Sequence, residues 1–182
     1  MATNTGAMVL RRSQIPFLGA FALVAVTALS SFAAAPRNAA NLFVIQRSKN
    51  AGEVHYDART TKEGTLDAKD AVDGYWMNDL PNDQWGRSEL SWIQKRAYGW
   101  DTRPEKDGTA FLKLRAFPDR NMWIVKNKGR WRVFTTIASK QAYMDRLYVA
   151  TDESGVLPKV LYVDVFGVDA ASGAALTEHI VP

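Results

Sequence analysis

The sequence predicts an all-β domain, either an antiparallel barrel of lipocalin-like architecture or a two-sheet sandwich, with one short helix. Three observations support this class. Apolar and β-branched residues run in short segments of period-two alternation, turn-forming residues separate the segments, and only one segment has helical spacing. The 182 residues are 47% hydrophobic and 23% charged, which is a globular composition and not that of a disordered chain.

Two hairpins are the clearest local signals. Residues 42–46 are β-branched and apolar, residues 49–52 have turn chemistry, and residues 53–59 alternate strictly. Gly129, in Asn127-Lys128-Gly129, suits the positive φ of a second tight turn. The other predicted strands are residues 72–78, 110–117, 122–126, 130–137, 142–151, 159–168 and 174–180, and the predicted core includes Val54, Tyr56, Leu112 and Leu114.

One segment, residues 88–99, has the spacing of a helix. Leu90, Ile93 and Ala97 lie three and four positions apart, which places them on one helical face. Ser88 suits the first turn as a cap, and Gly99 suits the end. We therefore expect a single short helix here, surrounded by an aromatic part of the core.

The N-terminal segment predicts export. Arg11 and Arg12 precede an uncharged stretch, residues 13–36, and no acidic residue occurs before Glu53. Small residues near the end of the stretch suit a signal peptidase, so we expect a signal helix that is removed by cleavage. The alternative is a retained anchor in the inner membrane, residues 15–35, which is about the length of a membrane-spanning helix.

This interpretation divides the chain into three parts. A signal peptide occupies residues 1–33, with cleavage near Ala33 to Ala35, and residues 34–41 form a short N-terminal segment. A single β domain follows over residues 42–182. The predicted location is periplasmic or secreted, with contact to the membrane only through an uncleaved signal segment.

The composition argues against several kinds of chemistry. The chain has no cysteine and only two histidines, which excludes disulfides and thiolate sites and leaves few ligands for a transition metal. The common cofactor and hydrolase motifs are missing as well, so no cofactor and no metal are expected. The cations Lys126, Lys128, Arg130 and Arg132 surround a turn and are interpreted as a solvated hairpin tip; no nucleic acid partner is expected.

Two acidic stretches have the oxygen ligands that calcium prefers, although neither follows the EF-hand spacing. Turn capping in contact with water is the more ordinary role for such side chains. The stretches consist of Asp67, Asp70 and Asp73, and of Asn78, Asp79, Asn82 and Asp83.

The strand over residues 53–59 carries the candidate catalytic residues. Alternation places Glu53, His55, Asp57 and Arg59 on one face. A histidine between carboxylates is suited to general base catalysis, so His55, Asp57 and Glu53 are catalytic candidates. The simpler interpretation is a strand face turned towards water, and the sequence favours it because an apolar core needs the alternate residues inside.

Candidate ligand-binding residues are Trp85, Trp100, Arg59 and Arg115. Both tryptophans are expected in loops beside the helix, where they would gate the mouth of a barrel. Arg115 belongs to a polar stripe that would converge inside a barrel with a polar lumen. The alternatives are that the tryptophans plug the barrel end and that the arginines face water. The rest of the stripe is Lys113, Arg130, Arg132, Asp145 and Asp164.

Several segments resemble the bacterial family numbered 4833 among the domains of unknown function. They are residues 41–50, residues 54–58, Tyr75-Trp76, residues 90–93, residues 97–99, residues 157–160 and Phe166-Gly167. The resemblance covers nearly all of the chain after the leader, from Asn41 to Ile180. It implies an exported or envelope protein without an assigned activity, and it brings no functional residues with it.

Three functions remain open from the sequence. The preferred one is non-catalytic binding of a small or lipid-like ligand by an exported envelope protein. The second is a structural or protein-interaction module of the cell envelope, with another envelope protein as partner. The third is a hydrolase-type enzyme that uses His55 with Asp57 or Glu53.

Overall fold

The computed structural model describes residues 38–48, 50–81, 84–152, 154 and 159–182. All of these belong to one compact unit, Phe32–Pro182. The predicted signal peptide, its cleavage site and the alternative anchor lie outside the described residues, as do Asn82 and Asp83. Across the described ranges, no helix combines the length and the apolar character needed to cross a membrane.

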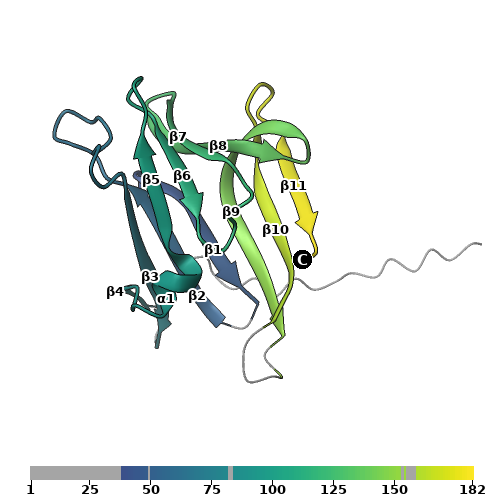
Figure 1. Ribbon diagram of the computed structural model, residues 1–182. Coiled ribbons are helices and arrows are strands. Elements are labelled where there is room, and N and C mark those ends of the chain that lie inside the picture. Colours follow the sequence, from purple (N-terminus) through teal and green to yellow (C-terminus); the bar gives the residue numbers. More distant parts are fainter. Residues whose placement is uncertain (1–37, 49, 82–83, 153, 155–158) are drawn as a thin grey trace, which may run out of the picture. The chain divides into compact units, whose positions relative to one another are not determined.

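The described chain is built almost entirely of strands, as predicted (Figure 1). Only one short α-helix, α1, interrupts them. The elements in chain order are β1 (Asn41–Arg47), β2 (Asn50–Ala58), β3 (Val72–Leu80), β4 (Gln84–Glu89), α1 (Gln94–Tyr98), β5 (Trp100–Pro104), β6 (Ala110–Leu114), β7 (Met122–Asn127), β8 (Arg130–Ile137), β9 (Lys140–Asp152), β10 (Lys159–Asp169) and β11 (Ala175–Ile180).

The long strand β9 joins all the others into one sheet. Its first half pairs with β8, its second half pairs with β1, and β10 runs along its other side. The hydrogen-bonded order is β4-β3-β2-β1-β9-β8-β7-β6-β5, with β10 and β11 beside β9. The sheet therefore divides at β9 into one group, β1 to β4, and another, β5 to β8 (Figure 1).

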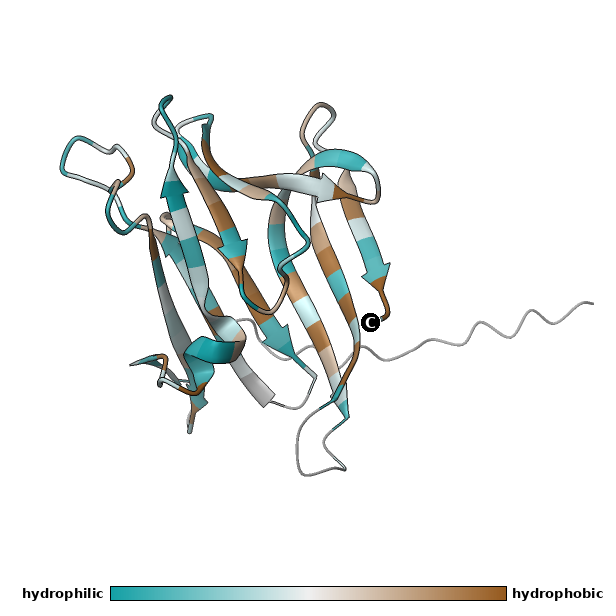
Figure 2. Ribbon diagram, in the orientation of Figure 1, coloured by the Kyte–Doolittle hydropathy of each residue, from teal (hydrophilic) through white to brown (hydrophobic). Residues whose placement is uncertain are grey.

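The apolar core fills the space between these two groups. Phe43 stacks on Tyr56 with ring centroids 4.4 Å apart, and the Trp100 ring of β5 meets Tyr56 edge-on at 5.7 Å. The Tyr56 hydroxyl donates a hydrogen bond to the Tyr98 carbonyl oxygen across 2.7 Å, which ties α1 to the same place. The predicted core residues Val54, Tyr56, Leu112 and Leu114 are all buried. Figure 2 shows the alternation behind this burial as brown and teal bands along β9 and β10.

The expected closed barrel is not found. Among the described strands, no ladder joins β4 to β5, so the sheet does not close on itself. The sheet is also not purely antiparallel, because β1 and β9 pair in parallel from Val44 with Arg146 to Arg47 with Val149. Period-two alternation predicts which side chains face the apolar core, but it carries no information on whether the last strand meets the first.

The predicted helix over residues 88–99 is wrong in its extent. Ser88 lies in β4 and Leu90 lies just after it. The helix α1 contains only five residues. The turn before it begins at Ser91, whose hydroxyl accepts a hydrogen bond from the Gln94 amide while the Gln94 side chain accepts one from the Ser91 amide. This reciprocal capping replaces the predicted Ser88 cap. Ile93, expected on a buried face, is exposed.

Two tight turns connect β7 to β8 and β8 to β9. Lys128 and Gly129 have φ values of 47° and 80°, as in the predicted hairpin with a two-residue loop. The β8–β9 turn uses the same geometry without glycine, since Ala138 and Ser139 have φ values of 49° and 64°. Left-handed backbone of this kind is strained for residues that carry a Cβ atom.

Candidate functional site

The face of β2 that carries Glu53, His55 and Asp57 is buried, which corrects the expected solvent-facing strand. Strand pairing places Tyr75 of β3 and Val44 of β1 beside His55, and Gln46 beside Glu53, on the side of the sheet away from the apolar core. All three ionisable residues are buried, whereas Arg59, which follows β2, is exposed. β2 is therefore buried on both faces, a pattern that alternation alone does not reveal.

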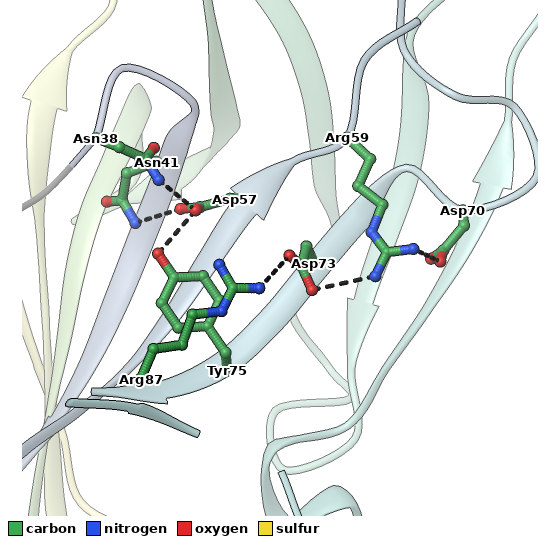
Figure 3. A network of polar contacts seen from close by, with 8 residues as sticks. All are labelled: Asn38, Asn41, Asp57, Arg59, Asp70, Asp73, Tyr75 and Arg87. Atoms are coloured by element: carbon green, nitrogen blue, oxygen red, sulfur yellow. Dashed lines mark hydrogen bonds and ion pairs between the residues drawn. The ribbon is translucent and has the colours of Figure 1, made fainter. Parts of the chain in front are cut away.

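Asp57 is the centre of a group of hydrogen-bond donors (Figure 3). The side-chain amides of Asn38 and Asn41 donate to its carboxylate across 2.6 Å and 3.0 Å, and the Tyr75 hydroxyl donates across 2.8 Å. Burial and the hydrogen bond to Asp57 raise the pKa of Tyr75 above its ordinary value. These donors satisfy the carboxylate, so Asp57 stabilises the junction of β1, β2 and β3.

Ion pairs continue this network towards the surface. Arg87 lies over the Tyr75 ring, 3.7 Å from its centroid, and donates to Asp73 across 2.7 Å. Arg59 bridges Asp73 and Asp70 (Figure 3). Partial burial would raise the pKa of Asp73, but the hydrogen bonds from Arg87 and Arg59 lower it below its ordinary value.

The described residues of the two acidic stretches have structural roles. Asp70 and Asp73 hold arginines, Asp67 caps the Lys69 amide across 2.9 Å, and Asn78 donates to Ser88 across 2.9 Å. Within the described residues, no group of three or more histidine and acidic side chains is placed to hold a metal ion.

His55 forms the hydrogen bond to a carboxylate that a general base needs, but it is inaccessible. Its Nε2 atom lies 2.9 Å from Oε2 of Glu53, and Glu53 in turn accepts a hydrogen bond from Gln46. Gln46 also accepts one from Arg146 across 3.0 Å. The His55 side chain has 0% exposure, and its Nδ1 atom has no hydrogen-bond partner. A substrate has no path to this imidazole in the described conformation.

A second histidine pair lies further along the same face and was missed from the sequence. Nδ1 of His179 in β11 is 2.6 Å from Oδ1 of Asp164 in β10, and its ring is 4.8 Å from the ring of Tyr162. Tyr148 of β9 adjoins Tyr162 at 6.3 Å. Each of these residues lies on a predicted strand, but the register of β10 against β11 was needed to bring Asp164 opposite His179.

Trp100 and Arg115, two of the predicted ligand-binding residues, line one surface hollow of about 230 Å³ together with Lys95 and Gly99. Gly99 allows the close packing, since an ideal Cβ atom there would lie 2.1 Å from the Lys95 carbonyl oxygen and 3.1 Å from Cδ of Arg115. The Arg115 amide donates to the Gly99 carbonyl oxygen across 2.9 Å. Arg115 also forms an exposed ion pair with Asp101 across 3.4 Å.

The tryptophans are not in loops as expected. Trp100 begins β5 and packs against Gly74 of β3, where an ideal Cβ atom would approach the indole ring to 2.3 Å. Trp85 is half-buried within β4. Arg59 lies with the acidic residues around Asp73, so the structure brings together Trp100 and Arg115 but not Trp85 or Arg59.

The comparisons with known proteins agree with the resemblance of the sequence segments. No curated protein and no solved structure matches the chain. The family model for a domain of unknown function, DUF4833, matches residues 43–179, which includes every strand from β1 to β11 at least in part. The chain therefore belongs to the DUF4833 family.

Proposed function

We propose that this protein is an exported envelope protein that binds a small anionic amphiphile without catalysis. The binding site is the hollow lined by Lys95, Gly99, Trp100 and Arg115, called here the Trp100 hollow. The observation that carries the proposal is that two cationic residues and a tryptophan, from α1, β5 and the residue after β6, line the same hollow.

The chemistry of the Trp100 hollow suits a ligand with an acidic head and an apolar part. Lys95 and Arg115 offer donors to an anion, and guanidinium recognises phosphate and carboxylate through paired hydrogen bonds. Trp100, which is half-buried, supplies an aromatic residue to the lining of the same hollow. Asp101 pairs with Arg115 at an exposed position, so an anionic ligand would compete only with a weak surface ion pair.

The buried histidine supports binding over catalysis. The hydrolase alternative needs His55 inside a cleft, but this side chain is fully enclosed by the sheet. The hydrogen bonds of Asp57 are also directed to neighbouring strands and not to an open space. The envelope location rests on the basic and then apolar N-terminal segment, which has the order of an export signal.

The test is isothermal titration of the full chain with dihexanoyl phosphatidylglycerol below its critical micelle concentration. Arg115→Gln and Lys95→Gln are each expected to weaken binding roughly tenfold, because each removes a charge-assisted hydrogen bond of about 1.5 kcal/mol or more.

The matched control is Arg130→Gln, which removes an exposed arginine from the β7–β8 hairpin and should leave the affinity unchanged. The absence of binding by the unsubstituted chain would overturn the proposal. An equal loss in all three variants would also overturn it, since it would indicate attraction by net charge instead of a site.

A further inference from the structure

Two large apolar side chains project from the turn that leads into α1. Trp92 is 70% exposed and its neighbour Ile93 is 61% exposed. Both exceed the exposed fractions of Leu80, Val160 and Leu161, the exposed apolar residues of the strands. Trp92 and Ile93 are adjacent in the sequence and both are exposed, and contiguous exposed apolar area of this kind marks interaction sites.

The turn holds these side chains outward. Ser91 and Gln94, which flank the pair, cap each other through their side chains, and the Lys95 amide donates to the Ser91 carbonyl oxygen across 2.9 Å. This closes the backbone around Trp92 and Ile93 in a fixed shape. The pair, called here the α1 tip, is therefore a preformed projection.

Two cationic residues lie close to the α1 tip in the sequence, and the exposed acids Glu89 and Asp101 lie just outside the segment that contains them. Lys95 and Arg96 follow the tip after Gln94, and the Arg96 guanidinium lies 5.3 Å from the centroid of the Trp92 ring. The segment from Ser91 to Trp100 contains no acidic residue. Lys95 also lines the Trp100 hollow with Arg115, so one of the cationic residues close to the tip belongs to the hollow.

We propose that the α1 tip docks this protein onto an anionic phospholipid bilayer. Trp92 and Ile93 enter the interface between headgroups and acyl chains, where tryptophan is enriched in membrane proteins. Lys95 and Arg96 contact the anionic headgroups, and the Trp100 hollow receives one of them. This docking rests on the proposed function, because it assigns the ligand of the hollow to the bilayer surface.

Size and charge favour a bilayer over a protein partner. A stable protein interface buries about 800 Å² on each side around an apolar centre, which is far more than two side chains offer. A bilayer needs only a small apolar projection with cations beside it, because each added charge near an anionic surface strengthens binding. The α1 tip has this composition.

The chain contains no cysteine, so a single introduced cysteine can be labelled at a chosen position. Ile93→Cys carries an environment-sensitive nitrobenzoxadiazole dye on the α1 tip of the full chain. The matched control is Val181→Cys, which is 68% exposed after β11, on the far side of β9 from the strands next to α1. Both proteins are mixed with vesicles of phosphatidylcholine alone and with vesicles containing phosphatidylglycerol.

We expect the dye at position 93 to brighten and shift to the blue with phosphatidylglycerol vesicles and to change little with phosphatidylcholine alone. The dye at position 181 should not respond. Lys95→Glu combined with Arg96→Glu should raise the lipid concentration that gives half of the response at position 93 at least tenfold. Added salt should weaken the response of the unsubstituted tip.

Several results would overturn the docking. One is the absence of a response from the dye at position 93, or a response equal to that of the dye at position 181. Another is an equal response of position 93 to both vesicle types. A third is a response without vesicles when only the protein concentration is increased, which would indicate self-association. If short-chain phosphatidylglycerol binds the hollow while position 93 stays silent, the docking fails and the proposed function stands. If position 93 responds but the short-chain lipid does not bind, the hollow fails as a headgroup site and the proposed function falls.

Discussion

Tyr75 shows how a single side chain can connect a buried acid to the surface. Its hydroxyl donates to Asp57 while its ring supports the guanidinium of Arg87. The neutral phenol is required for this arrangement, because a phenolate would be a second negative charge beside Asp57 and could not donate. Burial and this hydrogen bond raise the pKa of Tyr75, and burial raises the pKa of Tyr56 in the core.

These shifts predict how stability depends on alkaline pH. The unfolded chain releases tyrosine protons near pH 10, whereas the folded chain holds those of Tyr56 and Tyr75 to higher pH. A tyrosine whose pKa is raised in the folded protein contributes fully to stability below about pH 10, and this contribution is lost as the pH rises further. The free energy of unfolding should therefore fall above about pH 10.

Urea unfolding between pH 8 and pH 11, combined with phenolate absorbance, measures this effect. Tyr75→Phe is expected to make the alkaline fall shallower and to remove one late-ionising phenol from the native titration. The prediction fails if all tyrosines of the folded protein ionise together near pH 10.

At the scale of elements, the sequence predicted the strands with strong alternation and missed those without it. β4 contains mostly polar residues and β5 ends in a proline, so neither carries the apolar pattern of a strand. Both form because they pair with a neighbour, β4 with β3 and β5 with β6. Local apolar periodicity does not reveal a strand that is held mainly by backbone pairing with the next strand.

The candidate sites were predictable in the same partial way. Trp100 was chosen as a loop residue at the mouth of a barrel and Arg115 as part of a polar lumen, but the described sheet does not close into a barrel. A surface hollow brings the two residues together instead. The role of Lys95 depends on where α1 ends, and the partner of His179 depends on the β10–β11 register. Neither follows from residue spacing.

The β8–β9 turn predicts a stabilising substitution. Ser139 has a φ of 64°, which glycine adopts without the steric penalty of a Cβ atom. Ser139→Gly should raise the free energy of unfolding by about 0.5 to 1 kcal/mol. This gain is smaller than the steric penalty that is removed, because glycine also increases the conformational entropy of the unfolded chain. The hydrogen bond from the Ala138 amide to Glu178 keeps the turn in place.

Urea denaturation measures this change against Ala171→Gly. Ala171 is exposed in the turn before β11 and does not have a positive φ, so glycine there should lower stability. A decrease for both variants would show that the left-handed backbone at Ser139 is not the source of strain.

For the described molecule as a whole, β9 determines how distant parts of the chain must meet. Arg146 in β9 bonds Gln46 in β1 from 100 positions away, and β1 cannot pair on this side until β9 has formed. Loops of this length close at an entropic cost before any contact compensates, which slows folding.

We therefore expect refolding on a scale of milliseconds to seconds. Stopped-flow dilution from urea, followed by tryptophan fluorescence, measures the rate, and the six tryptophans provide the signal. Complete recovery within the mixing time would contradict the argument that closing the long loop between β1 and β9 slows folding.

The lack of closure between β4 and β5 leaves rows of backbone donors and acceptors on which another polypeptide could build amyloid-like ladders. The chain guards both rows with side chains that resist such addition. β4 presents Arg87 and Glu89, and β5 combines Asp101 and Arg103 with Pro104, which has no amide proton to offer. Replacing these charges with β-branched apolar residues would turn the two edge strands into templates for aggregation.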